Sequence, residues 1–189
     1  MIALIQEKFP SRIATPCVSS HTDTEFHVYD PPLTVRAEGD TSPIRRQPCS
    51  RRIGEPQEAD LKVSNPQAHI IHLVAIDACS YLSDDATRCD CALVRDQDIR
   101  FVEFKHGTKT RRSERVKSCI PQLAATINDY FKAGIIAPKS VVLAIACVGF
   151  QEEFPPRSAQ LEARQAQLNL LVGDDIVVEL IVTDSTTFA

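Results

Sequence analysis

Three residues between positions 90 and 105 carry side chains that could do chemistry: Asp90, Glu103 and Lys105. Glu103 and Lys105 are two residues apart in the alternating stretch IRFVEFK, so on a β-strand both side chains leave the same face. An acid and a base among apolar neighbours lose hydration, and this costs free energy unless a partner or a metal ion compensates their charge. Paired carboxylates suit Mg²⁺ or Mn²⁺, and such an ion can polarise a phosphate and activate water. The combination is typical of phosphodiester hydrolysis.

The segments around these residues predict a β-hairpin that brings the three side chains together. DCALVRD (90–96) and IRFVEFK (99–105) both alternate polar and apolar residues, as strands with one buried face do. The turn between them would place Asp90, at the start of the first strand, beside Glu103 and Lys105. We therefore expect two carboxylates and one ammonium group to converge at one end of the hairpin.

The chain from residue 69 onward shows further regular patterns. Apolar, β-branched runs predict strands, and apolar residues at helical spacing predict helices. The predicted strands are 69–76, 90–96, 99–105, 140–150 and 175–184, and the predicted helices are 111–133 and 158–171. Pro121 implies that the first of these helices either begins there or is kinked. The fold class is α/β, with a mixed central sheet flanked by helices.

The first part of the chain has a different composition. Residues 1–68 hold eight of the twelve prolines and show little periodicity, which predicts loops, turns and short edge strands. We therefore expect an irregular, proline-rich segment 1–68 that packs on a domain formed by residues 69–189.

The segment RCDCALVRDQDIRFVEFKHG resembles the D-x(n)-(D/E)-x-K segment of the PD-(D/E)xK nuclease superfamily. The resemblance covers about residues 70–150 and implies a restriction-endonuclease-like αβββαβ core. The chain departs from the family pattern at Cys89, where many members have proline. Members include restriction enzymes and Holliday-junction resolvases, so the resemblance implies a metal-dependent nuclease.

The resemblance also implies roles for individual residues. Asp90 and Glu103 would hold Mg²⁺ or Mn²⁺ together with the backbone carbonyl of Phe104. Lys105 would orient the attacking water or stabilise charge on the phosphate. The helix after the hairpin often carries a further glutamine or basic residue near the site. Gln122 matches that position, with a structural role as its alternative, and the basic candidates are Arg115 and Lys117.

The family also places an acid on its first helix. The candidates for this third acid are Glu7, Glu58 and Asp60. The sequence does not distinguish among them, because no strong helical pattern precedes residue 69.

Positive charge is concentrated next to the predicted site. The chain has a net charge of −4, but residues 100–117 carry seven Lys and Arg against two Glu. A nucleic-acid backbone would lie against such a surface, and we expect DNA rather than RNA. A solvated polar face is the alternative interpretation. The predicted contacts are Lys109, Arg111, Arg112, Arg115 and Lys117, and a second basic cluster comprises Arg45, Arg46, Arg51 and Arg52.

The seven cysteines are irregularly spaced and odd in number, which argues against a secreted disulfide scaffold. We therefore expect free thiols and a cytoplasmic protein. Cys89 and Cys91, with Cys79 upstream, could suggest zinc, because C-x-C on a strand would direct both thiols to one face. No matching pair follows, so we expect these thiols to pack in the core. No apolar run is long enough to cross a membrane, and we expect no membrane partner.

Two functions from different classes remain open. The first is a Mg²⁺- or Mn²⁺-dependent nuclease. The second is a catalytically inactive protein of the same fold that acts as a binding, immunity or regulatory partner of another protein. A homodimer is compatible with the resemblance, although no interface can be located in the sequence.

Overall fold

The computed structural model describes residues 1–32, 46–57, 59–81, 87–107, 110–149 and 158–189. The helical elements are α1 (Ile2–Lys8), the short segment η1 (Ile76–Ser80), α2 (Arg112–Lys132) and α3 (Ser158–Val172). The strands are β1 (Val18–His21), β2 (Glu25–Tyr29), β3 (Ser50–Arg51), β4 (Leu61–Ser64), β5 (Ile71–Ala75), β6 (Cys91–Arg95), β7 (Asp98–Phe104), β8 (Val141–Cys147), β9 (Val177–Val182) and β10 (Ser185–Thr187).

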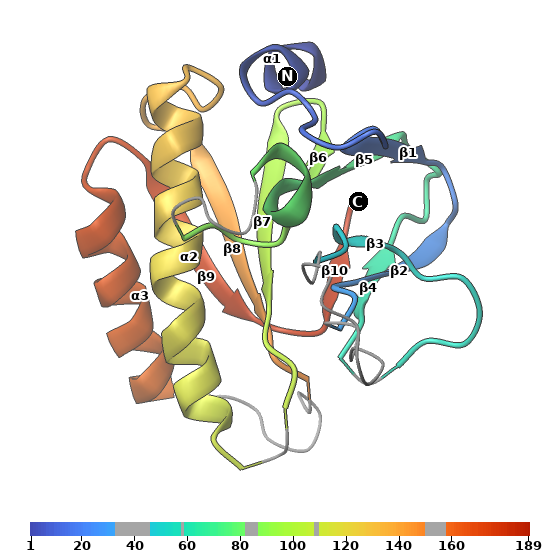
Figure 1. Ribbon diagram of the computed structural model, residues 1–189. Helices are drawn as coiled ribbons and strands as arrows, with labels where there is room; N and C mark the ends of the chain where they lie inside the picture. The colour runs from blue at the N-terminus through green and yellow to red at the C-terminus, as the bar shows by residue number, and fades with distance from the viewer. Residues whose placement is uncertain (33–45, 58, 82–86, 108–109, 150–157) are drawn as a thin grey trace, which may run out of the picture.

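The larger sheet has six strands in the order β1-β5-β6-β7-β8-β9 (Figure 1). Strands β5, β6 and β7 are antiparallel, whereas β8 and β9 run parallel to β7 after crossovers through α2 and α3. The predicted mixed sheet with helices packed on it is therefore confirmed. The predicted strands and helices from residue 69 follow in the expected order, with η1 after β5 and β10 after β9 as additional elements. Pro121 lies inside α2, so the alternative in which the helix begins there is wrong.

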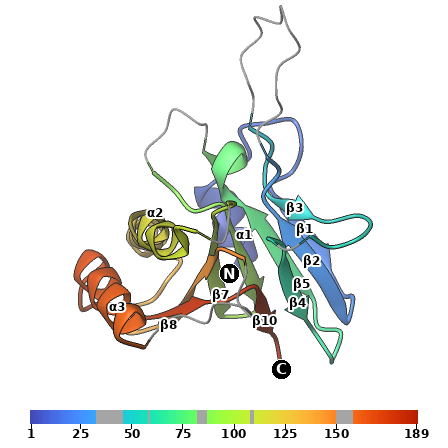
Figure 2. The ribbon, with the colours of Figure 1, turned by 90° about the horizontal axis from the view of Figure 1, so that it is seen from below.

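A second, four-stranded sheet has the order β10-β4-β2-β3. Its strands β2, β3 and β4 come from residues 1–68, and β10, from the C-terminal end, pairs in parallel with β4. Strand β1 also comes from residues 1–68, but it pairs with β5 and so extends the larger sheet. Figure 2 shows three layers: helices α2 and α3, the six-stranded sheet, and the smaller sheet on its other side.

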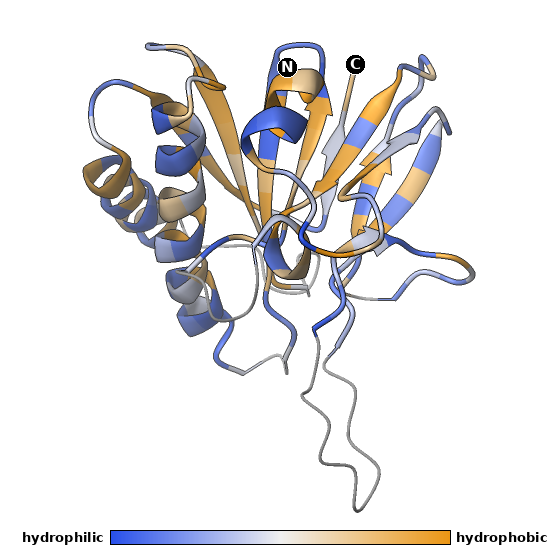
Figure 3. Ribbon diagram, turned by 45° about the horizontal axis from the view of Figure 1, so that its top comes forward, coloured by the Kyte–Doolittle hydropathy of each residue, from blue (hydrophilic) through white to orange (hydrophobic). Residues whose placement is uncertain are grey.

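Apolar residues fill both interfaces of this arrangement, as the hydrophobic strands in Figure 3 indicate. One cluster lies between the helices and the large sheet and contains Phe101 and Tyr130. The other lies between the two sheets and contains Phe26, Val102 and Phe104. Successive residues of β7 thus enter opposite clusters, because successive side chains of a strand leave opposite faces. The large sheet is covered on both sides.

Two cysteines differ from the expectation of free thiols. Cys17 and Cys79 form a disulfide that links the segment before β1 to η1, across 62 residues of sequence. The expectation is wrong for this pair, and disulfides are rare in a reducing cytoplasm. Pairing of β1 with β5 brings the two cysteines together, which no local spacing indicates. Within the described residues, none of the helices combines the length and apolarity needed to cross a membrane.

Candidate functional site

A tight hairpin places the two predicted acids opposite each other. Strands β6 and β7 are joined through Asp96, whose φ of 53° fits the left-handed conformation that two-residue hairpin turns require. The register pairs Cys91 with Val102, so the preceding residue, Asp90, stands opposite Glu103. The hairpin that the alternating pattern predicts therefore brings these carboxylates to one end of the two strands.

Asp90 is fixed by the strand that it faces. Its side chain is 1% exposed, and Oδ2 accepts a hydrogen bond of 2.7 Å from the backbone N–H of Phe104. Because the N–H and C=O of one strand residue leave on the same side, we expect the carbonyl of Phe104 to face Asp90 as well. Burial and the charge of Asp30 raise the pKa of Asp90 to about 7, although the Phe104 bond and Arg46 oppose that shift.

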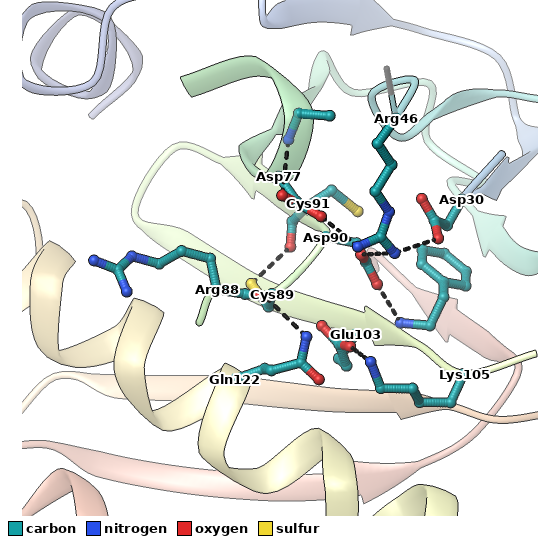
Figure 4. Close-up of polar contacts among 12 residues, drawn as sticks. Asp30, Arg46, Asp77, Arg88, Cys89, Asp90, Cys91, Glu103, Lys105 and Gln122 are labelled. Atoms are coloured by element: carbon teal, nitrogen blue, oxygen red, sulfur yellow. Dashed lines mark hydrogen bonds and ion pairs between the residues drawn. The ribbon is translucent and has the colours of Figure 1, made fainter. Parts of the chain in front are cut away.

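Glu103 is completely buried, and Lys105 is its ion-pair partner among the described residues. Lys105 Nζ forms an ion pair with Oε1, while Oε2 accepts no hydrogen bond from the described part of the chain. Burial and the charge of Asp90 raise the pKa of Glu103 well above its ordinary value. Burial opposes the charged form of Lys105, but Glu103 outweighs that effect and raises the pKa of Lys105. Figure 4 shows Glu103 between Asp90 and Lys105.

Helix α2 holds the residue before Asp90 in place. The hydroxyl of Thr126 accepts a hydrogen bond of 2.8 Å from the backbone N–H of Cys89, and both groups are buried. One turn earlier, the side-chain amide of Gln122 donates to the carbonyl oxygen of Arg88 at 3.1 Å. Gln122 therefore lies beside the segment that leads into Asp90, and its amide is directed to the backbone of that segment.

Three further charged residues reach this site from segments that the sequence pattern does not connect to it. The guanidinium of Arg46 lies 2.6 Å from Asp77 Oδ2, 3.0 Å from Asp30 Oδ2 and 3.4 Å from Asp90 Oδ1 (Figure 4). The sequence marks Arg46 only as part of a basic cluster, and its patterns do not point to Asp30 or Asp77. The one local signal is that each acid stands directly after an apolar strand, which is weak by itself.

The candidates for a third acid lie elsewhere. Glu7 is exposed on α1 and pairs with Lys8. Asp60 is buried and forms a bidentate ion pair with Arg52, in which Nε contacts Oδ2 and Nη2 lies 2.7 Å from Oδ1. Glu58 lies outside the described residues. The described acids nearest Asp90 in the network of ion pairs are instead Asp30 and Asp77.

The predicted nucleic-acid contacts separate into two kinds. Arg112 Nε donates to the carbonyl of Gly149 at 3.1 Å, and Arg115 donates to the carbonyls of Val148 and Thr110. These two arginines, at the start of α2, therefore bind backbone carbonyls just after β8, and Arg115 also binds the carbonyl of Thr110 just before α2. Arg111 and Lys117 are exposed on the same part of the helix, and Lys109 lies outside the described residues.

Cys89 and Cys91 are buried, free thiols, but they enter different clusters on the two faces of the large sheet. The expectation that C-x-C directs both thiols to one face is wrong, because Cys89 precedes β6 and is not part of its pleat. The two thiols pack as small apolar groups, as predicted.

The site offers donors that suit a hard divalent cation. Asp90, Glu103 and the carbonyl of Phe104 supply oxygen atoms, and Oε2 of Glu103 is a buried acceptor that needs a positive partner. In the parts of the chain that the structure describes, no three His, Cys, Asp or Glu side chains are already grouped as metal ligands. The chemistry fits Mg²⁺ or Mn²⁺, and the carboxylates would have to draw together around the ion.

Comparison of the chain with protein-family models, with curated proteins and with solved structures gave no match.

Proposed function

We propose that the protein is a metal-dependent nuclease that hydrolyses phosphodiester bonds of nucleic acid, DNA in preference to RNA. The observation that carries the proposal is the convergence of Asp90, Glu103 and Lys105 at the end of one hairpin, with both carboxylates buried. Burying two acids side by side is costly even with Lys105 and Arg46 as partners, because apolar residues of similar volume often stabilise a fold as well as buried ion pairs do. A role in catalysis would account for their presence.

The arrangement of elements around the hairpin supports the same proposal. Strands β5, β6 and β7, helix α2 and strand β8 come in the order of the βββαβ part of a restriction-endonuclease-like core, with η1 inserted after β5. Helix α1 packs on the same face of the sheet as α2, but strands β1–β4 separate it from β5 in the chain. Asp90 precedes the second of these strands, and Glu103 and Lys105 belong to the third or follow it directly. Their positions in the fold thus agree with the resemblance seen in the sequence.

In the proposed reaction, Asp90, Glu103 and the Phe104 carbonyl would hold Mg²⁺ or Mn²⁺, which would polarise the scissile phosphate and lower the pKa of a bound water. Lys105 is 26% exposed at its side chain, so its ammonium group can reach both Glu103 and a ligand in solvent. It would orient the attacking water or stabilise the charge that develops on the phosphate. The exposed Arg111 and Lys117 would bind the nucleic-acid backbone.

The test is cleavage of plasmid DNA and of RNA with Mg²⁺ or Mn²⁺, with EDTA as the metal-free control. Asp90→Asn, Glu103→Gln and Lys105→Ala should each lower the cleavage rate by at least about a hundredfold. Lys62→Ala is the matched control, because Lys62 forms an exposed ion pair with Glu25 on the smaller sheet. Equal cleavage by the wild type and by Lys105→Ala would remove Lys105 from the mechanism, and equal cleavage by all three variants would remove the site from the reaction.

One observation favours the second candidate, a catalytically inactive binding protein. Arg46 already neutralises part of the charge beside Asp90, as a structural ion-pair network would. Calorimetry with Mn²⁺ separates the two candidates. Binding that Asp90→Asn abolishes supports the nuclease, whereas absence of Mn²⁺ binding together with absence of cleavage supports the inactive protein.

A further inference from the structure

One arginine cross-links three carboxylates that come from three separate segments. Asp30 follows β2, Asp77 lies in η1 after β5, and Asp90 precedes β6. The guanidinium of Arg46 contacts all three, at 2.6–3.4 Å, and stands at the centre of the group (Figure 4). The three acids are therefore arranged around a single cationic position, which the protein fills with its own side chain.

Backbone contacts hold these acids independently of Arg46. Asp90 accepts from the N–H of Phe104, and the N–H of Asp77 lies 3.3 Å from the carbonyl oxygen of Asp90. His106, directly after Lys105, bonds through Nε2 to the carbonyl oxygen of Asp30 at 3.0 Å. Removal of the guanidinium would thus leave the three carboxylates near one another, because these contacts connect Asp30, Asp77 and Asp90 to each other and to the residues at the C-terminal end of β7.

The charges at this position favour a cation of higher valence. Four carboxylates (Asp30, Asp77, Asp90 and Glu103) face two cations (Arg46 and Lys105), a formal excess of two negative charges. Glu103, opposite Asp90, also has a fully buried Oε2 that accepts no hydrogen bond from the described residues, and both Asp90 and Arg46 act on its charge. Once Arg46 leaves, that formal excess rises to three negative charges, and a divalent ion would offset two of them while giving the buried oxygen a positive partner.

Arg46 is the member of the group best able to leave. Its side chain is 31% exposed, against 1% for Asp90 and 7% for Asp30. An arginine that leaves toward water recovers hydration, whereas the acids cannot follow it without exposing apolar packing. Exchange of the guanidinium for a metal ion is therefore a local event.

We infer that Asp30, Asp77 and Asp90 form one cation site, which Arg46 occupies in the metal-free protein and must vacate before Mg²⁺ or Mn²⁺ can bind. The inference rests on the proposed nuclease function and assigns its further metal-binding acids to Asp30 and Asp77. It makes Arg46 a built-in competitor of the metal. It also accounts for the absence of a ready-made group of ligands in the described residues, because the guanidinium holds the three carboxylates apart.

Calorimetric titration of the full chain with MnCl₂ tests the inference. Arg46→Gln removes the competing charge and should bind Mn²⁺ at least about tenfold more tightly than the wild type. Arg51→Gln is the matched control, since Arg51 pairs with the exposed Asp23 and should leave the affinity unchanged. Asp77→Asn, which removes a ligand, should weaken binding by about tenfold or more.

If Arg46→Gln fails to fold, as judged by circular dichroism, Arg46→Lys replaces it. Lysine keeps the charge but lacks the fork that reaches three carboxylates, so it should compete less and tighten Mn²⁺ binding. Binding by the wild type that neither variant tightens would overturn the inference and leave the proposed nuclease standing. Absence of Mn²⁺ binding in wild type and variants alike would overturn both.

Discussion

Asp90 accepts a hydrogen bond of 2.7 Å from the backbone N–H of Phe104, across the open end of the β6–β7 hairpin. This contact orients the carboxylate before any ligand arrives, and because its donor is a backbone N–H, only proline at position 104 would remove that donor. The same carboxylate is buried and stands near Asp30, which raises its pKa to about 7. Asp90 is thus held in a defined orientation in an environment that disfavours its charged form.

Because this environment disfavours the charged carboxylate, we expect Asp90 to lower the free energy of unfolding as the pH rises. Its pKa is about 7 in the folded protein against an ordinary value of 3.8, so between about pH 4 and pH 7 the folded state retains a proton that the unfolded state has lost. Stability falls as the pH rises through that window. Asp90→Asn should therefore be more stable than the wild type at pH 8, by about 2–4 kcal/mol. Urea unfolding in EDTA measures the difference.

The gain from Asp90→Asn should shrink as the pH is lowered toward 4, where the carboxyl of the wild type is protonated in the folded state and about half protonated in the unfolded state. Asp23→Asn is the matched control, because Arg51 lowers the pKa of Asp23 and no gain is expected from that change. A stability difference between Asp90→Asn and the wild type that is the same at pH 5 and pH 8 would contradict the prediction.

Thr126 provides a second, independent test of how the site is positioned. Its hydroxyl is the acceptor for the buried N–H of Cys89, so Thr126→Val leaves that donor unsatisfied at nearly constant volume. We expect a loss of about 1–3 kcal/mol in the free energy of unfolding. Because Cys89 leads into Asp90, Mn²⁺ affinity should fall as well.

Thr126→Ser keeps the hydroxyl and loses only a methyl group, so it should retain Mn²⁺ affinity near that of the wild type. If the serine and valine variants bind Mn²⁺ equally, the hydrogen bond to Cys89 has no part in positioning Asp90.

The sequence predicts local features of this site well and its distant partners poorly. The alternation in 90–105 identifies the hairpin and the face that Glu103 shares with Phe101, because periodicity reports which side of a strand is buried. Arg46, Asp30 and Asp77 carry no such signal. They meet only because β2 and β5 belong to two sheets that pack together, which is a property of tertiary structure.

The same limit applies to the smaller sheet. The prolines of residues 1–68 predict short strands and turns, and the described part of this segment contains the short strands β1–β4 and also helix α1, but the prolines do not identify the strands' partners. The parallel pairing of β10 with β4 joins Ser185 to Lys62, more than a hundred residues apart. Pairing over that distance depends on which apolar faces are left uncovered once the central sheet has formed, and no window of sequence contains that information.

The disulfide between Cys17 and Cys79 should contribute measurably to stability. It closes a loop of 62 residues, and the cross-link reduces the entropy of the unfolded chain. Cys17→Ser with Cys79→Ser should lower the free energy of unfolding by about 2–4 kcal/mol. Thiol titration of the unfolded, unreduced wild type should give five reactive groups, corresponding to the five free cysteines. A count of seven would mean that the disulfide does not form.

The ion pair of Glu103 with Lys105 offers the sharpest separation of stability from function. Lys105→Met leaves Glu103 buried without its cation and should destabilise the protein by about 1–3 kcal/mol, less than for a fully buried pair because Lys105 is partly exposed. Glu103→Met combined with Lys105→Met replaces the pair by apolar side chains of similar length and should restore wild-type stability or exceed it. Lys62→Met, in the exposed pair with Glu25, is the control and should change stability by less than about 0.5 kcal/mol.

Restored stability in the double variant, together with loss of Mn²⁺ binding and cleavage, would mean that the fold retains these two charges for chemistry. A double variant less stable than Lys105→Met alone would instead make the pair a structural element of the core.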